Sequence, residues 1–228
     1  MAPGSSEIFS TIPNAGEAMA LTLDMGGRLD PALDILAYLA EEEVCTTLFV
    51  TGAISQTPAG EAVLAIIAAH AELFEVGNHT MHHCNLRAGG AGSPTRAPCE
   101  TGGPPDQAFV AAELTDAAAI IEAGTGQDPT PYWRPPEGAY TDAVLETAAE
   151  LGYTKTVLWT LDTRDWQPLE EGGPTAEVIA ENVLTVSGSG SIILMHLGGY
   201  ETLDALHLLV PALRERGLLL TSVSDLLN

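Results

Sequence analysis

The feature that most constrains this chain is the alternation of short apolar runs with longer amphipathic stretches along its 228 residues. Seven runs have the composition of strands: 18–24, 45–50, 73–78, 131–134, 155–161, 191–196 and 218–222. They are short, apolar and bounded by turn residues, as is typical of buried parallel strands. The pattern therefore predicts an α/β fold with a parallel sheet enclosed by helices.

Six amphipathic stretches separate these runs: 30–43, 58–70, 106–124, 141–152, 175–187 and 202–217. Asp30 and Pro31 have the residue types of an N-cap and a first helical position, and Gly124, Gly152 and Gly217 stand where C-caps are expected. About seven strand–helix units favour a closed or nearly closed barrel, with an open doubly wound sheet as the alternative. Either fold places its site at the carboxyl ends of the strands.

The chain length suits one domain over 1–228, with a Gly- and Pro-rich inserted loop at 84–105. Asp and Glu number 31 against 8 Lys and Arg, a net charge of −23, which argues against nucleic acid and anionic membrane partners. The sequence contains no apolar run of about 18 residues or more, so no membrane span is predicted. The first ten residues lack the pattern of a signal peptide. The sequence does not indicate an oligomeric state.

The three cysteines differ in their surroundings. Cys45 lies in an apolar run and is expected to be a buried small hydrophobe. Cys84 and Cys99 flank the loop and are expected to form a disulfide, with two free thiols as the alternative. A disulfide suits a secreted or cell-envelope protein, and a cytoplasmic location stays open.

Chemically capable residues gather at one end of the predicted strands. They follow five different runs: Asp24; His79, His82 and His83; Arg134; Asp162, Asp165 and Trp166; and His196. The carboxyl ends of parallel strands meet on one face, so these side chains are expected to form one site.

Two of the histidines have the spacing of metal ligands. If the segment after Asn78 is helical, His79 and His83 lie on one face and can share a metal, and His82 offers an alternative pair at a spacing of three. His70 and His207 lie within or at the end of helices and are expected to be structural. Histidines with carboxylates favour a divalent metal, zinc most readily.

The remaining residues complete a hydrolytic site. Asp24 could take a proton from a water, His196 could protonate the leaving group, and Asp165 could orient and charge that histidine. Arg134 could hold Asp24 and lower its pKa. No G-x-S-x-G motif is present, and Cys84 as a nucleophile is a minor alternative.

From about residue 18 to 222, the chain resembles the polysaccharide deacetylases of carbohydrate esterase family 4, which share the NodB homology domain. Five motifs carry the resemblance, in order: "LTLDMGG", "HTMHH", "RPPEGAY", "DTRDW" and "LMH". It implies a distorted (β/α)7 barrel and metal-dependent removal of N- or O-acetyl groups from a glycan such as peptidoglycan or a chitin-like polymer.

The resemblance also implies roles for individual residues. Asp24 is the catalytic base and His196 the catalytic acid, with Arg134 orienting the first and Asp165 tuning the second. The metal ligands are His79, His83 and Asp24, and the metal is zinc, with cobalt, nickel or manganese as alternatives. The substrate-binding residues are Trp166 and Leu194, which wall the acetyl pocket, and Glu137, whose backbone N–H holds the oxyanion.

Two positions depart from the family pattern. Glu137 stands where tyrosine is common, and Met25 stands where the second acid of the first motif is a metal ligand. A thioether is a poor zinc ligand. Three outcomes stay open: Asp24 reaches the metal itself, two histidines and waters hold it, or metal binding is lost. The alternative functions are a non-catalytic glycan-binding barrel and a metal-dependent amidase acting on a small amide.

Overall fold

A computed structural model of the protein describes residues 4–90, 99 and 102–228. Its nine strands form one curled sheet in which every ladder is parallel. They are β1 (Glu7–Phe9), β2 (Ala18–Met25), β3 (Thr46–Val50), β4 (Phe74–Asn78), β5 (Tyr132–Trp133), β6 (Lys155–Val157), β7 (Leu161–Asp162), β8 (Ile192–His196) and β9 (Leu219–Leu220). The spatial order is β1-β6-β5-β4-β3-β2-β8-β7, and β9 pairs separately with β2. The predicted α/β fold with a parallel sheet is confirmed.

The strand predicted over 155–161 is divided into β6 and β7. β6 pairs with β1 and β5, whereas β7 pairs with β8 at the other end of the sheet. Between them, the Leu158 N–H donates to Phe9 and the Thr160 N–H donates to Ile192. This one apolar run therefore crosses between the two ends of the strand order and brings the sheet close to a barrel. β1, with three residues and no apolar alternation, was not predicted.

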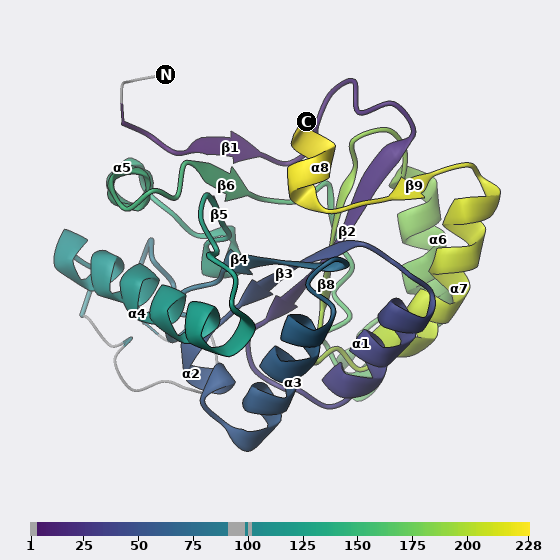
Figure 1. Ribbon diagram of the computed structural model, residues 1–228, viewed down its shortest axis with the longest axis horizontal. Coiled ribbons are helices and arrows are strands. Elements are labelled where there is room, and N and C mark those ends of the chain that lie inside the picture. The colour runs from purple at the N-terminus through teal and green to yellow at the C-terminus, as the bar shows by residue number, and fades with distance from the viewer. Residues whose placement is uncertain (1–3, 91–98, 100–101) are drawn as a thin grey trace.

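The helices ring the outside of the curled sheet (Figure 1). They are α1 (Ala32–Glu41), α2 (Gly52–Ser55), α3 (Pro58–Ala69), α4 (Gln107–Thr125), α5 (Asp142–Glu150), α6 (Ala176–Val186), α7 (Thr202–Glu215) and α8 (Val223–Leu227). The six predicted helices are all present. The two that were not predicted, α2 and α8, have four and five residues, too few to show a helical period.

Two of the predicted helix ends are wrong. Pro31 is the N-cap of α1 and Asp30 instead pairs with Arg28 at 3.0 Å. Gly124 lies inside α4, and the left-handed C-cap is Gly126. A side chain at Gly124 would collide with Leu64 of α3, so this glycine is used for close helix packing. Gly152 and Gly217 do follow their helices with positive φ, as expected.

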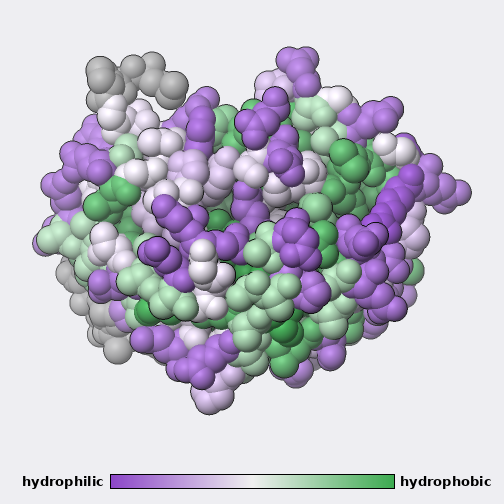
Figure 2. Space-filling view, viewed as in Figure 1, coloured by the Kyte–Doolittle hydropathy of each residue, from purple (hydrophilic) through white to green (hydrophobic). Residues whose placement is uncertain are grey.

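The largest apolar cluster lies between the sheet and helices α1, α3, α6 and α7. On the face shown in Figure 2, hydrophobic residues form separate patches among hydrophilic ones. This surface agrees with helices that bury one apolar stripe and expose a polar one. Among the helices of the described ranges, none has both the length and the apolar character needed to cross a membrane.

Candidate functional site

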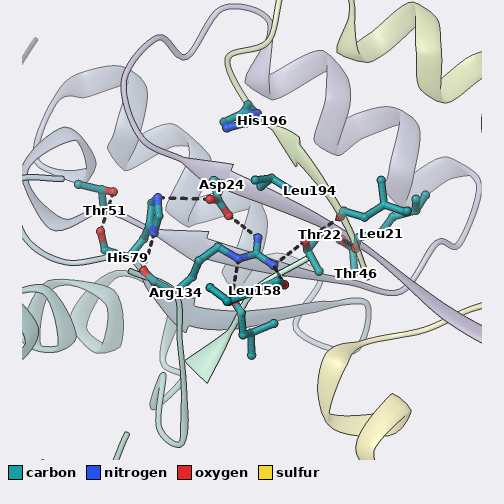
Figure 3. Close-up of polar contacts among 12 residues, drawn as sticks. Leu21, Thr22, Asp24, Thr46, Thr51, His79, Arg134, Leu158, Leu194 and His196 are labelled. Atoms are coloured by element: carbon teal, nitrogen blue, oxygen red, sulfur yellow. Dashed lines mark hydrogen bonds and ion pairs between the residues drawn. The ribbon is translucent and has the colours of Figure 1, made fainter. Parts of the chain in front are cut away.

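The site is built around a buried ion pair between β2 and the segment after β5. The Arg134 Nη1 donates to Asp24 Oδ1 at 2.6 Å, and both side chains are almost completely buried (Figure 3). Arg134 also donates to the backbone carbonyls of Val157 and Leu158 and to the Thr22 hydroxyl, so its guanidinium group is held on several sides. Burial opposes ionisation of Asp24, but the charge and hydrogen bond of Arg134, together with the nearby His79 and His196, outweigh it and lower the pKa of Asp24. Asp24 is therefore an ionised carboxylate held in one orientation.

His79 faces the second oxygen of this carboxylate. The His79 Nδ1 donates to the backbone carbonyl of Arg134 at 2.8 Å, because a carbonyl can only accept. The His79 Nε2 lies 3.3 Å from Asp24 Oδ2 (Figure 3). Burial lowers the pKa of His79, so the neutral ring directs its Nε2 lone pair at a carboxylate oxygen. Two facing lone-pair atoms in a buried site fit a cation placed against them.

His83 lies beside His79, but the predicted helical segment that would align them is absent. Residues 79–83 form a loop, with positive φ at Thr80 (67°) and His83 (56°). The loop still brings the two rings to 4.8 Å between centroids. Burial lowers the pKa of His83 to about 3, so the ring is neutral and able to donate a lone pair. A side chain at Gly26 would collide with the His83 ring, so the glycine after Met25 makes room for it.

His82 does not take part in this group. Its Nδ1 lies 2.6 Å from Glu113 Oε1, and its backbone N–H donates to Glu113 Oε2 at 2.9 Å. The alternative metal pair that includes His82 is therefore not formed. His70 lies 3.8 Å from Glu72, and His207 packs against Tyr38, in agreement with structural roles for both.

Met25 turns away from these groups. Its side chain is fully buried in the large apolar cluster, and its sulfur accepts from the Ser55 hydroxyl of α2 at 3.9 Å. Over residues 4–90, 99 and 102–228, no three His, Cys, Asp or Glu side chains are arranged as a metal site. His79 and Asp24 thus offer facing ligand atoms with His83 beside them, but the three are not drawn together as a closed metal site, and no second acid stands beside Asp24.

A second buried pair lies on the neighbouring strand end. In the β2–β8 ladder Asp24 is the direct partner of His196. The His196 Nδ1 lies 2.7 Å from Asp165 Oδ1, and its backbone N–H donates to Asp165 Oδ2 at 2.9 Å. Burial opposes the charge on His196, but the charge and hydrogen bond of Asp165, together with the nearby Asp24 and Asp162, outweigh it and raise the pKa of His196. Asp24 and His196 therefore form an adjacent pair of one ionised carboxylate and one readily protonated imidazole.

Sequence reasoning missed the residues that support Asp165. The Thr202 hydroxyl, at the first residue of α7, donates to Asp165 Oδ2, and the Tyr200 N–H donates to the Asp165 backbone carbonyl at 2.8 Å. Gly199 must lack a side chain because a Cβ there would collide with Thr202 and Asp165. The Gly-Gly pair that ends the "LMHLGG" segment was the available signal.

Asp24, His83 and His196 line one cavity of about 520 Å³. Its walls include the three predicted substrate residues: Trp166, which is 49% exposed, Leu194, which is buried, and Glu137. Glu137 has a positive φ of 59°, and its carboxylate accepts from the Asn85 amide at 2.6 Å. The other side chains of the lining are Asp162, which was expected in the site without an assigned role, and Arg28, Trp159 and Tyr200, which were not expected there.

The predicted disulfide joins Cys84 to Cys99. It fixes the chain directly after His83, at the edge of the site. Of the predicted loop 84–105, residues 91–98 and 100–101 lie outside the described ranges. Cys45 is free and half-buried, less enclosed than predicted, because it precedes the first residue of β3.

Comparisons with known proteins place the chain among proteins of related sequence and fold. Two relatives match over 95% of the chain: a peptidoglycan-N-acetylglucosamine deacetylase of Bacillus cereus (30% identity, 91% of its length) and a chitooligosaccharide deacetylase of Sinorhizobium fredii (29%, 96%). A CE4 family pseudoenzyme from Bacillus anthracis has the same fold, with a TM-score of 0.78, 25% identity, and coverage of 98% of this chain and 70% of its own. A mutant of it with restored enzymatic activity gives a TM-score of 0.80, 26% identity, and coverage of 98% and 72%. Residues 12–156 match the polysaccharide deacetylase family itself. The chain belongs to the polysaccharide deacetylase family.

Proposed function

We propose that this protein is a metal-dependent hydrolase that removes acetyl groups from an N-acetylated glycan, such as peptidoglycan or a chitin-like polymer. The observation that carries the proposal is the pairing of Asp24 with His196 at one cavity. Arg134 favours the ionised form of the first, and Asp165 favours the protonated form of the second. Deacetylation of an amide needs a base for the attacking water and an acid for the departing amine.

Asp24 serves as the base. Its Oδ1 is occupied by Arg134, so Oδ2 is the oxygen that can receive a proton. His196 serves as the acid. Its Nδ1 is held by Asp165, which leaves Nε2 to protonate the leaving nitrogen. The two roles fall on the two sides of one ladder, so a substrate amide in the cavity meets both groups.

His79, His83 and Asp24 would hold the divalent metal, most readily zinc. Both imidazoles are neutral, as metal ligands must be, and the His79 Nε2 and His83 Nδ1 are buried without a hydrogen-bond partner among the described residues. The metal, when bound, supplies Lewis-acid polarisation of the acetyl carbonyl and lowers the pKa of a water. We infer that Met25 replaces the second acid of the first motif, so that Asp24 acts as both ligand and base.

Leu194 and Trp166 would wall the acetyl group, and the backbone N–H of Glu137 would stabilise the oxyanion. Trp166 and Tyr200 are exposed by 49% and 45%, which favours a polymer lying across the cavity over a small amide enclosed within it. The polymer is expected to stack on these rings.

The second candidate function is a glycan-binding barrel without catalysis. Met25 favours it, because this residue stands where the family has a metal-binding acid and its side chain is buried in the apolar cluster instead. The likeness to a pseudoenzyme also favours it. In that case the protein binds chitooligosaccharide or peptidoglycan fragments but releases no acetate.

Metal content and acetate release separate the two functions. The protein is purified with zinc or cobalt in the medium, dialysed, analysed for metal and incubated with chitooligosaccharide, peptidoglycan and acetylxylan. Stoichiometric metal and acetate from at least one glycan are expected. A metal-free protein that releases no acetate, yet binds a glycan, would replace the first proposal with the second.

A further inference from the structure

The loop that carries His79 and His83 has a shape that its own residues do not favour. Residues 79–83 are neither helix nor strand, and Thr80 and His83 have positive φ values of 67° and 56°. Residues with side chains rarely adopt this conformation, and it persists where the surrounding structure holds it. The positions of the two imidazoles therefore depend on contacts from outside the loop.

The first half of the loop is attached to the beginning of α2. The Gly52 N–H donates to the Thr80 carbonyl at 3.0 Å, and the Ala53 N–H donates to the Met81 carbonyl at 2.7 Å. These two bonds fix the course of the main chain as far as Met81. The residues that lead into the second imidazole follow after this point.

Glu113 of α4 attaches the second half of the loop. Its Oε2 accepts from the His82 backbone N–H at 2.9 Å, and its Oε1 lies 2.6 Å from the His82 Nδ1. Glu113 is only 3% exposed, and hydrogen bonds that are shielded from water are electrostatically stronger than exposed ones. One buried carboxylate therefore holds both the main chain and the ring of the residue that precedes His83.

The next residue of the same helix supports the beginning of the loop. The Leu114 carbonyl accepts from the Asn78 side-chain amide at 2.9 Å, and the Asn78 Oδ1 accepts from the Thr80 N–H at 2.8 Å. Glu113 and Leu114 both lie inside α4, a helix of 19 residues. Consecutive residues of one rigid element thus bond both ends of the loop.

We propose that Glu113 is a positioning residue: through His82 it holds the loop in the shape that brings the His79 and His83 rings together beside Asp24. The inference rests on the proposed function for the metal that these rings would bind. Because the loop is ordered before the metal arrives, binding does not have to order it, and the affinity for the metal rises accordingly. His82, a metal-ligand candidate by its spacing, serves instead as the point at which the loop is anchored.

Three variants of α4 test the inference. Glu113→Ala removes both contacts with His82. Glu113→Gln is the conservative variant: its oxygen can accept from the His82 N–H, and its amide can face the ring, whose tautomer adjusts. Ile121→Ala, farther along the same helix in the large apolar cluster, is the matched control, because it removes core packing instead of the loop contact.

Metal affinity is the first readout. Competition with a chromophoric chelator gives the Kd for zinc, and the visible spectrum of the cobalt-loaded protein reports the coordination geometry. Glu113→Ala is expected to weaken zinc binding by about tenfold or more and to change the cobalt spectrum, whereas Glu113→Gln is expected to stay within about threefold of the wild type. Ile121→Ala is expected to lower the Tm of the metal-free protein and to keep the wild-type Kd for zinc.

Hydrogen exchange of the metal-free protein under native conditions is the second readout. The amides of residues 79–83 are expected to exchange faster in Glu113→Ala than in the wild type, Glu113→Gln or Ile121→Ala. Unchanged exchange or an unchanged Kd for zinc in Glu113→Ala would overturn the inference. So would an equal loss in Glu113→Gln, which would assign the effect to charge, or in Ile121→Ala, which would assign it to stability.

Acetate release, measured on the same proteins, decides the proposed function separately. A wild-type protein that binds no zinc and releases no acetate would refute that function, while the exchange measurement needs no metal and still decides whether Glu113 holds the loop. Acetate release together with an unchanged Kd for zinc in Glu113→Ala would support the function and refute the inference. The two failures are therefore distinguishable.

Discussion

Asp24 and Arg134 form a contact of 2.6 Å between two almost completely buried side chains. The two residues are 110 positions apart in the sequence, and each would be an isolated buried charge without the other. The carboxylate that we propose as base is therefore also half of a structural ion pair. This double role decides how the first two experiments must be designed.

Asp24→Asn is expected to lower kcat/KM for acetate release by at least about a hundredfold, because an amide cannot accept the proton. The variant keeps the shape of the side chain and one acceptor for Arg134. Circular dichroism checks that the fold is retained, and Asp116→Asn on the exposed side of α4 serves as the matched control. Turnover close to wild type would refute the assignment of Asp24 as base.

Arg134→Met is expected to destabilise the protein by about 3–5 kcal/mol, because it leaves the Asp24 carboxylate buried without its cation. Urea denaturation gives the change in the free energy of unfolding. The double variant Asp24→Asn with Arg134→Met should lose less than the sum of the two single changes, since it leaves no buried charge. Additive losses would show that the pair is not energetically coupled.

The pH profile should have two limits with opposite causes. The base must be ionised, and the pKa of Asp24 lies below its usual 3.8, so activity falls only when the pH drops through that low value. The acid must be protonated, and the pKa of His196 lies above its usual 6.5, so activity falls when the pH rises through that raised value. Asp165→Asn removes the charge that raises the pKa of His196.

In the Asp165→Asn variant, the alkaline limit of kcat/KM should therefore move to lower pH while the acidic limit stays. Thr202→Ser, which keeps the hydroxyl that donates to Asp165, is the conservative control and should retain the wild-type alkaline limit. An unchanged alkaline limit in Asp165→Asn would mean that His196 is not the acid.

Met25→Asp should tighten zinc binding by at least about tenfold if the second acid of the first motif is simply missing. Because Met25 is buried in the apolar cluster, the same change should lower Tm without metal, and zinc should restore it. Met25→Leu, which conserves volume, should cost under about 1.5 kcal/mol and leave zinc affinity unchanged. Equal zinc affinity in Met25→Asp and the wild type would show that the metal is held without this position.

The disulfide between Cys84 and Cys99 closes a segment with a sequence separation of 15. Its reduction should destabilise the protein by about 3 kcal/mol through loop closure. Titration of the denatured, unreduced protein should find one reactive thiol, that of Cys45. Three reactive thiols would contradict the bridge.

Much of the fold could be predicted because each long strand and helix has its own hydrophobic period. The strand at 18–24 and the helix at 58–70 were placed within one residue of β2 and α3. The split of 155–161 could not be predicted, since its two halves have similar composition and only the partner strands, β5 and β8, divide them. Asp30 is not the cap of α1, which begins one residue later than predicted, and its carboxylate pairs with Arg28.

The meeting of several candidate residues could be expected from the sequence, but their conformations could not. Asp24, Arg134, His79 and His196 do meet, because parallel strands end on one face. The loop geometry at His83 depends on two positive φ values that its sequence does not signal. The direction of Met25 depends on the packing of β2 against α2, which is a tertiary property.

Arg134 makes two contacts in the site: its side chain donates to Asp24, and its backbone carbonyl accepts a hydrogen bond from the His79 Nδ1. One residue thereby positions both the Asp24 carboxylate, which we propose as the base, and the His79 imidazole, which we propose as a metal ligand. Asp24 comes from β2 and His79 follows β4, yet both are positioned by this one residue. A substitution at position 134 that also displaced its backbone would therefore disturb the carboxylate and the imidazole at the same time.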